Sequence, residues 1–200
     1  MPDVPEETSP KPVTEPAATA APAAAANTAP PKPAPVPWES DTVEQLRQMF
    51  GPAILDAASY LDQNYLVIER GICYSLLALM RARFGYNILT DLTAVHYPKD
   101  ALPFEMVWLL YSMGSNERVR VKARFAEGEE APSITDLWVC ANWLEREVYD
   151  MFGVRFTGHP DLRRILLPEE WQGFPLRKDY GLKQQDAAWV QKNLGIESGQ

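Results

Sequence analysis

Residues 117–125 read ERVRVKARF and alternate strictly between apolar and basic side chains. In a β-strand successive side chains point to opposite faces, so this period of two predicts a strand with one buried face. The apolar face holds Val119, Val121, Ala123 and Phe125, and the opposite face holds Arg118, Arg120, Lys122 and Arg124. We expect the basic face to meet solvent or a partner.

The neighbouring sequence extends this strand into a sheet. Apolar runs at 88–96 and 104–113 predict two more strands, and shorter runs at 53–58 and 65–68 predict a pair around a turn at 62–64. Helical patterns occupy 41–50, where Asp41 and Glu44 form a capping-box-like pair, and 72–84, which Gly85 ends. We therefore predict an α+β fold, a two-layer domain with a mixed β-sheet of about five strands and three helices.

The third predicted helix starts at Ser133 with Asp136 and ends at Gly153. Its apolar stripe comprises Leu137, Ala141, Leu144, Val148, Met151 and Phe152, and its opposite face Val139, Trp143, Arg146 and Asp150. That second face is either solvated, with an Arg146–Asp150 pair, or directed at a partner. Because tryptophan and arginine are enriched in interface hot spots, we favour the partner.

Composition divides the chain into three parts. Residues 1–37 contain eleven of the eighteen prolines and ten alanines, which predicts a disordered extension. The α+β domain is expected at 38–152. Residues 153–200 combine glycines and prolines with large apolar residues, which predicts an extended irregular C-terminal segment that lies on another surface.

Several classes of function are disfavoured by simple counts. The formal net charge of −8 argues against nucleic-acid binding. Cys73, Cys140, His96 and His159 lack metal-ligand spacing, so we expect no metal site and no cofactor in this chain, with both cysteines as free thiols. Apolar stretches such as 72–80 are too short to cross a bilayer.

Residues 145–166, EREVYDMFGVRFTGHPDLRRIL, gather carboxylates and arginines around a glycine-containing turn. A catalytic or metal site would have to use Asp150, His159 and Asp161, as in an autonomous metal-dependent enzyme. Glu145 and Glu147 lie about 160° apart on a helix and cannot share one site. Because the nearby arginines compete for the carboxylates, an ionic interface is the simpler interpretation.

The stretch TDLWVCANWLEREVYDMFGVRFTGHPDLRRILLPEEW, followed by GFPLRKDY, resembles the 30 kDa subunit family of respiratory complex I, whose bacterial members are the C subunits of NADH-quinone oxidoreductase. The similarity carries the ordered motifs ERExxDxFG, GHPDLR and PLRKDY and is strong over about 133–182. It departs from the family at Gly181, where proline is usual. The resemblance implies a cofactor-free peripheral-arm subunit of this proton-pumping complex, on the cytoplasmic side of the cell membrane.

In such a complex, NADH electrons reach a quinone through FMN and iron–sulfur clusters held by other subunits. The resemblance implies that this chain packs against the 49 kDa hydrogenase-like subunit and contributes no catalytic, cofactor or metal residues. The expected partner-binding residues are Trp143, Arg146, Asp150, His159, Asp161, Arg163, Arg164, Trp171, Arg177, Asp179 and Tyr180. An equivalent scaffold subunit of a membrane-bound hydrogenase or a ferredoxin-fed quinone reductase is the alternative.

Overall fold

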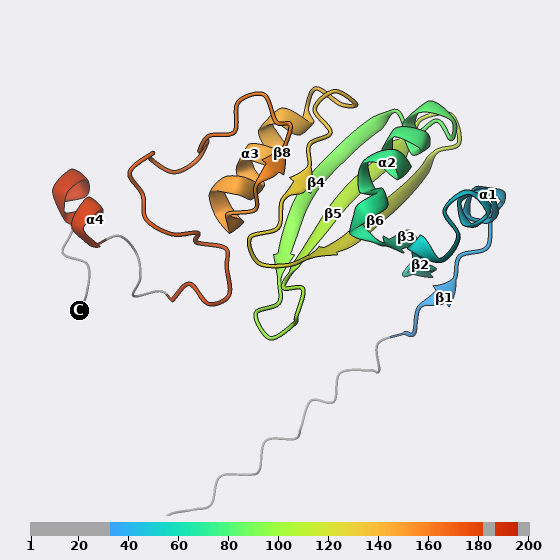
Figure 1. Cartoon of the computed structure of the whole chain (residues 1–200), viewed down its shortest axis with the longest axis horizontal. Coiled ribbons are helices and arrows are strands. Elements are labelled where there is room, and N and C mark those ends of the chain that lie inside the picture. The colour runs from blue at the N-terminus through green and yellow to red at the C-terminus, as the bar shows by residue number, and fades with distance from the viewer. Residues whose placement is uncertain (1–32, 182–186, 196–200) are drawn as a thin grey trace, which may run out of the picture. The chain divides into compact units, whose positions relative to one another are not determined.

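The computed structural model describes residues 33–181 and 187–195 (Figure 1). Most of the predicted extension, residues 1–32, lies outside the described residues, as do 182–186 and 196–200 within the predicted irregular stretch 153–200. The elements in chain order are β1 (Val36–Pro37), α1 (Asp41–Phe50), η1 (Gly51–Ala53), β2 (Ile54–Tyr60), β3 (Gln63–Ile68), η2 (Arg70–Ile72), α2 (Cys73–Ala82), β4 (Ile88–His96), β5 (Phe104–Ser112), β6 (Glu117–Phe125), β7 (Ala131–Pro132), α3 (Ala141–Phe152), β8 (Phe156–Thr157) and α4 (Ala187–Leu194).

The main sheet has six strands in the order β1-β2-β3-β6-β5-β4. All neighbours are antiparallel except β3 and β6, which run parallel, so the sheet is mixed. This confirms the predicted fold class. The strand beyond the expected five is β1, because Val36 and Pro37, assigned from sequence to the extension, pair with Ser59 and Ala58.

One face of the sheet carries the core. Strand β6 buries its four predicted apolar side chains there, and β5 adds Phe104, Met106, Trp108 and Leu110. Helices α1, α2 and α3 cover this face with residues that include Leu46, Leu76, Leu77, Met80 and Val148. The result is the predicted two-layer arrangement, with the basic side of β6 facing away from the helices.

Helix α1 spans the predicted residues 41–50, but its capping residue differs from the predicted one, and α3 starts later than predicted. Helix α1 is capped by Ser40, whose Oγ accepts the Val43 N–H at 3.2 Å, and Asp41 is its first residue. Helix α3 starts at Ala141, eight residues after the predicted Ser133. Residues 133–140 form turns instead, in which the Ile134 carbonyl accepts both the Leu137 and Trp138 N–H groups.

The turns at residues 133–140, before α3, are held by contacts with other parts of the chain. The Trp138 indole N–H donates to the Asn87 carbonyl at the start of β4, at 3.1 Å. On their other side, the short parallel pair β7–β8 joins residues 131–132 to 156–157. These tertiary contacts outweigh the local helix signal, because tertiary context routinely overrides propensity.

Candidate functional site

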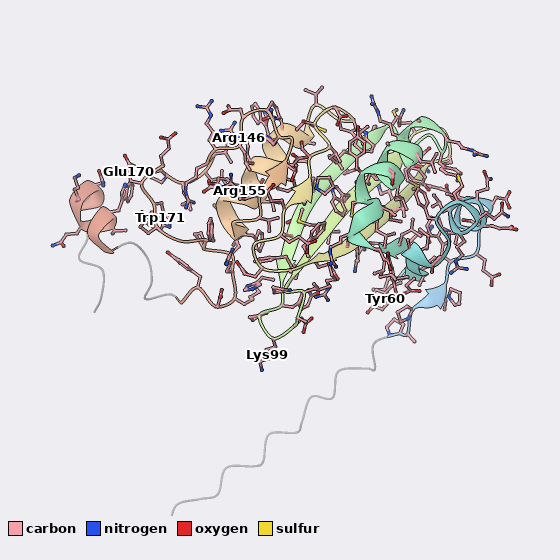
Figure 2. All side chains as sticks on the ribbon, in the orientation of Figure 1. Tyr60, Lys99, Arg146, Arg155, Glu170 and Trp171 are labelled. Atoms are coloured by element: carbon pink, nitrogen blue, oxygen red, sulfur yellow. The ribbon has the colours of Figure 1, made fainter. Side chains whose placement is uncertain are left out.

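The charged sequence 145–166 folds as helix α3 followed by an irregular segment, residues 154–181, which we call the C-terminal segment. This segment contacts α3 once per turn, at Asn142, Arg146 and Asp150. These positions are four residues apart, so they share one face of the helix. Arg146 is labelled beside the segment in Figure 2.

The first two contacts bind main-chain carbonyls. The Asp161 N–H donates to His159 Nδ1 at 3.0 Å, so His159 Nε2 carries the proton and donates to the Asn142 carbonyl at 3.1 Å. One turn further on, Arg146 donates from Nε to the Arg163 carbonyl at 3.1 Å and from Nη2 to the Arg164 carbonyl at 3.0 Å. The path of 159–164 is therefore set by α3.

Asp150 makes the third contact and is fully buried. Its Oδ1 lies 2.6 Å from Arg164 Nη1, while Oδ2 accepts the N–H groups of Ile165, Leu166 and Leu167 at 3.0, 2.7 and 2.9 Å. Burial by itself raises the pKa of Asp150, but the amides and the Arg164 guanidinium outweigh it, so the pKa lies below the usual value. Asp150 is therefore a charged anchor for the segment.

Arg164, a residue of the C-terminal segment, binds both α3 and later parts of the segment. Beyond Asp150 Oδ1, its guanidinium donates to the Asp150 carbonyl at 3.2 Å and to the Trp171 and Gly173 carbonyls at 3.0 and 3.1 Å. It also lies over the Phe174 ring, 5.4 Å from the centroid. One arginine thus closes the loop 165–173 onto the helix.

Arg177 fastens the segment to the end of α3. Its Nε donates to the Phe152 carbonyl at 2.5 Å and its Nη1 to Glu127 at 3.0 Å, while the Leu176 N–H donates to the Met151 carbonyl at 3.1 Å. Gly153 ends the helix at φ 76°, and a Cβ there would lie 2.6 Å from the Phe174 ring. Glycine is required both by the backbone conformation and by this close approach.

Further along, the segment reaches the edge strand β4. The Lys178 N–H donates at 3.0 Å to Nδ1 of His96, a buried side chain that stacks on Phe104 with 4.8 Å between ring centroids. The Asp179 carboxylate lies 3.6 Å from the same nitrogen. No role for His96 was evident from the sequence, and the structure shows that it accepts a main-chain hydrogen bond from the C-terminal segment.

Trp171 and Tyr180 pack within the C-terminal part of the chain. Trp171 lies edge-on to Trp189 of α4, with ring centroids 5.7 Å apart. A Cβ at Gly173 would lie 2.6 Å from the Tyr180 ring, so the two residues are in close contact. Helix α4 was not predicted, because the sequence interpretation treated all of 153–200 as irregular.

Other predicted partner-binding residues remain accessible. Trp143 on α3 is 70% exposed, and Val139, one turn before it, is 86% exposed. Asp161 and Arg163 form an ion pair at 2.9 Å with both side chains more than half exposed. These residues keep the capacity to meet another protein.

The prediction that Asp150 faces outward with Trp143 is wrong. The helix face that holds Arg146 and Asp150 is occupied by the chain's own C-terminal segment, and Arg146 binds carbonyls rather than Asp150. The side chains of Asp150 and Arg164 are 0% and 13% exposed in the chain by itself, so these two charges lose water on folding rather than on binding to a partner. A helical projection shows which residues share a face of α3, but it does not show that a later part of the chain covers that face.

Comparison with known proteins bears directly on this helix and segment. Residues 66–186, more than half of the chain, match the family described as the respiratory-chain NADH dehydrogenase 30 kDa subunit. The chain belongs to this 30 kDa subunit family. The predicted resemblance is thereby confirmed, and the match includes α2, β4–β6, α3 and the C-terminal segment.

Relatives of the 30 kDa subunit family cover most of the folded region. The C subunit of NADH-quinone oxidoreductase from Geotalea uraniireducens is 39% identical over 145 residues, spanning 72% of this chain and 88% of that protein. The C 2 subunit of the same enzyme from Rhizobium etli is 50% identical over 141 residues, covering 69% and 75%. Each is a protein to which this chain is similar.

A solved structure shares the fold. A chain of the membrane-bound sulfane sulfur reductase, MBS, an archaeal respiratory membrane complex, superposes with a TM-score of 0.63. The overlap covers 78% of this chain and 91% of that one, at 23% sequence identity. At 23% identity this similarity concerns the fold of the two chains and nothing further.

Glu145 is a structural residue that the sequence did not identify. It is fully buried on α3, and its Oε1 accepts the Ile134 N–H at 2.8 Å, while Oε2 has no hydrogen-bond partner among the described residues. Burial raises the pKa of Glu145 to about 7. Glu145 and its partner Ile134 are eleven residues apart in the sequence, and local sequence rules do not pair residues at that separation.

The described residues also bear on metal binding and on membrane insertion. Within 33–181 and 187–195, no three His, Cys, Asp or Glu side chains are grouped as metal ligands would be. In the same ranges, no helix combines the length and apolar character needed to cross a membrane. Asp150 and His159, two members of the hypothetical metal set, are engaged in the contacts that hold the C-terminal segment.

Proposed function

We propose that this chain is a cofactor-free structural subunit in the peripheral arm of a proton-pumping NADH-quinone oxidoreductase, on the cytoplasmic side of the cell membrane. The complex passes electrons from NADH, through FMN and iron–sulfur clusters in other subunits, to a quinone. The observation that carries the proposal is the family match over residues 66–186, joined to relatives named as the C subunit of this enzyme.

The chemistry of α3 supports a structural role. Asp150 Oδ2 accepts three main-chain N–H groups of the C-terminal segment, and its Oδ1 accepts the Arg164 guanidinium. Arg146 and Arg164 donate to main-chain carbonyls of the segment. A carboxylate with four donors is committed to holding a conformation, because general acid–base work needs an available lone pair or proton. These residues shape a surface instead of acting on a substrate.

The docking surface comprises large apolar side chains that remain exposed on and around this scaffold. Val139 and Trp143 project at the start of α3, and Leu166 and Leu176 on the segment are 63% and 48% exposed. Exposed apolar groups rimmed by charge are typical of protein interfaces. The partner proposed for this surface is the 49 kDa hydrogenase-like subunit.

The experiment is replacement of Trp143 by alanine in cells that depend on this subunit. We expect the yield of assembled complex, and with it NADH-quinone reductase activity, to fall at least tenfold, since truncating an interface tryptophan costs about 2 kcal/mol or more. The matched control is Met113→Ala, because Met113 is similarly exposed (66%) on the β5–β6 turn. Equal yields for both variants would remove Trp143 from the interface.

The cofactor and the electron donor need separate measurements. Purified chain should be colourless and contain no stoichiometric zinc, iron or flavin, and one tightly bound metal per chain would contradict the structural role. Mass spectrometry of the complex that co-purifies with the chain identifies the donor. NADH-oxidising subunits support the proposal, whereas hydrogenase or ferredoxin-binding subunits assign the same scaffold to the alternative complexes.

A further inference from the structure

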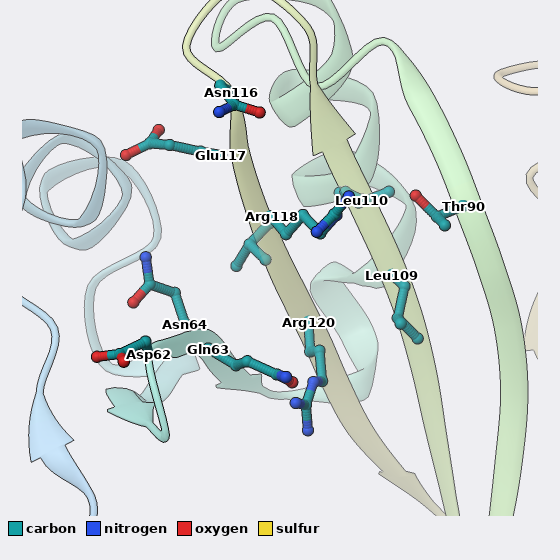
Figure 3. A pocket seen from close by; sticks show the side chains of 11 residues that line it. Asp62, Gln63, Asn64, Thr90, Leu109, Leu110, Asn116, Glu117, Arg118 and Arg120 are labelled. Atoms are coloured by element: carbon teal, nitrogen blue, oxygen red, sulfur yellow. The ribbon is translucent and has the colours of Figure 1, made fainter.

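The second face of the main sheet carries a row of cations. Strand β6 directs its apolar side chains into the core, so its alternate residues Arg118, Arg120, Lys122 and Arg124 project from the opposite face. All four are at least partly exposed. Figure 3 shows Arg118 and Arg120 on β6, between Leu109 of β5 and the β2–β3 turn.

This face is hollowed at both ends of the row. At the start of β6 a hollow of about 530 Å³ is lined by Arg118, Arg120, Leu109, Thr90, Gln63 and Asn64, with Asp62 and Glu117 also among its lining residues. At the far end of the strand, a second hollow of about 440 Å³ is lined by Arg124, Val67, Leu55 and Leu102, together with the charged residues Glu69 and Arg70. The face therefore offers apolar floor beside the cations.

The two ends of the row differ in charge balance. Arg124 pairs with Asp100 and Glu105 at 3.0 Å each, and Lys122 lies 3.7 Å from Glu105. Arg118 rests 5.1 Å above the Tyr111 ring, and within residues 33–181 and 187–195 no ion pair involves Arg118 or Arg120. This cationic surface belongs to a chain whose net charge is −8.

We propose that this open sheet face binds an acidic amphipathic α-helix of a partner protein, laid along β6. Side chains on one face of a strand repeat every ~6.7 Å, and helix residues four apart rise ~6 Å, so carboxylates one turn apart match successive cations. The apolar stripe of such a helix lies beside its acidic stripe and would cover Leu109 on β5. A helix on this face completes a three-layer arrangement that sheets commonly adopt.

The first experiment uses the full chain and a synthetic probe. The probe is a peptide of about 18 residues with glutamate at every third or fourth position beside a leucine stripe, and its counterpart has glutamine in place of glutamate. Fluorescence anisotropy should show binding by the glutamate peptide and at least tenfold weaker binding by the glutamine peptide. No binding by the unmodified chain overturns the proposal.

Variants locate the binding face. The double variant R118E/R120E should weaken binding at least tenfold, while R47E/K99E, with the same change in charge at exposed positions outside this face, should change it less than twofold. R118Q/R120Q provides the second measurement if charge reversal disturbs folding, which a melting curve reports. Equal weakening by both double variants would show non-specific charge attraction and overturn the inference.

The second experiment identifies the natural occupant in the assembled complex. Carbodiimide coupling joins amines to carboxylates at ion-pair distance, and the row offers Lys122 and, in the R120K variant, a second amine. Adducts with acidic residues of a helix in another subunit support the proposal. Adducts with Asp3, Glu6, Glu7 or Glu15 of the same chain, or tighter binding of duplex DNA than of the peptide, overturn it. The peptide measurement uses the full chain without the complex. Its result therefore tests this inference even if the proposed function as a subunit is wrong.

Discussion

Strands β4, β5 and β6 bury contiguous apolar side chains on one face. The C-terminal segment adds only a few side chains to this core, such as Val154 and Phe156, and is fixed mainly by charged groups that bind its main-chain atoms. In the sheet, stability comes from removing apolar area from water and from the strand ladder. In the segment, Asp150 and three arginines provide most of the fixed contacts. One chain thus contains a sheet that is stabilised by apolar burial and a segment whose backbone path is fixed by charged side chains.

Removal of a large side chain from the core of the sheet should destabilise the chain more than any single change in the C-terminal segment. Trp108 is fully buried on β5, so Trp108→Ala leaves a cavity in the core. We expect the free energy of unfolding to fall by about 3–5 kcal/mol. Urea denaturation of the full chain, followed by circular dichroism, measures the change. A smaller loss would mean that neighbouring core side chains close the cavity.

The segment side is tested by Asp150→Asn. The substitution keeps the shape but removes the charge that accepts from Arg164 and three amides, so local opening of the segment should become easier by about 2–3 kcal/mol. Hydrogen exchange should show faster exchange at Ile165, Leu166 and Leu167, with little change at Val121 in β6. Equal acceleration in both regions would contradict the separation.

Glu145 lies on α3, the helix that holds the C-terminal segment, and makes the stability of the chain depend on pH. Its pKa rises from 4.5 unfolded to about 7 folded, so the folded chain binds the extra proton. Its contribution to stability is therefore complete below pH 4.5 and is lost as the pH rises through about 7. We expect Glu145→Gln, which resembles the protonated form, to be more stable than the natural chain at pH 8 by about 1–2 kcal/mol. Denaturation curves at pH 5 and pH 8 test this, and an equal difference at both would exclude the titration.

The smallest effect is expected for Asp161→Asn. Asp161 pairs with Arg163 at 2.9 Å, but both side chains are largely exposed, so water screens the interaction. The stability of the free chain should change by less than about 1 kcal/mol. This variant is also the matched control for Asp150→Asn, since both remove one carboxylate charge from the same stretch. A loss as large as that of Asp150→Asn would show that the exposed pair holds the segment.

The contrast between the regions also explains what sequence reasoning could predict. Strand β6 was predicted to the residue, because a period of two in its side chains follows directly from strand geometry. The start of α3 and the burial of Asp150 were not, because both depend on contacts over eleven or more residues, from Glu145 to Ile134 and from Asp150 to Leu167. The sequence interpretation of the charged stretch 145–166 did not count the chain's own C-terminal segment among the surfaces that this stretch binds.

The contacts of α3 with the C-terminal segment have a further consequence for how the family can vary. Most of these contacts use main-chain groups of the segment. Arg146 binds the carbonyls of Arg163 and Arg164, and Asp150 accepts the N–H groups of Ile165, Leu166 and Leu167. Arg164 in turn binds the carbonyls of Trp171 and Gly173. Every residue type except proline has both of these groups. The side chains at 165, 166 and 172 can therefore be exchanged while the loop keeps its path, which lets evolution or an engineer retune partner preference on a backbone that stays in register.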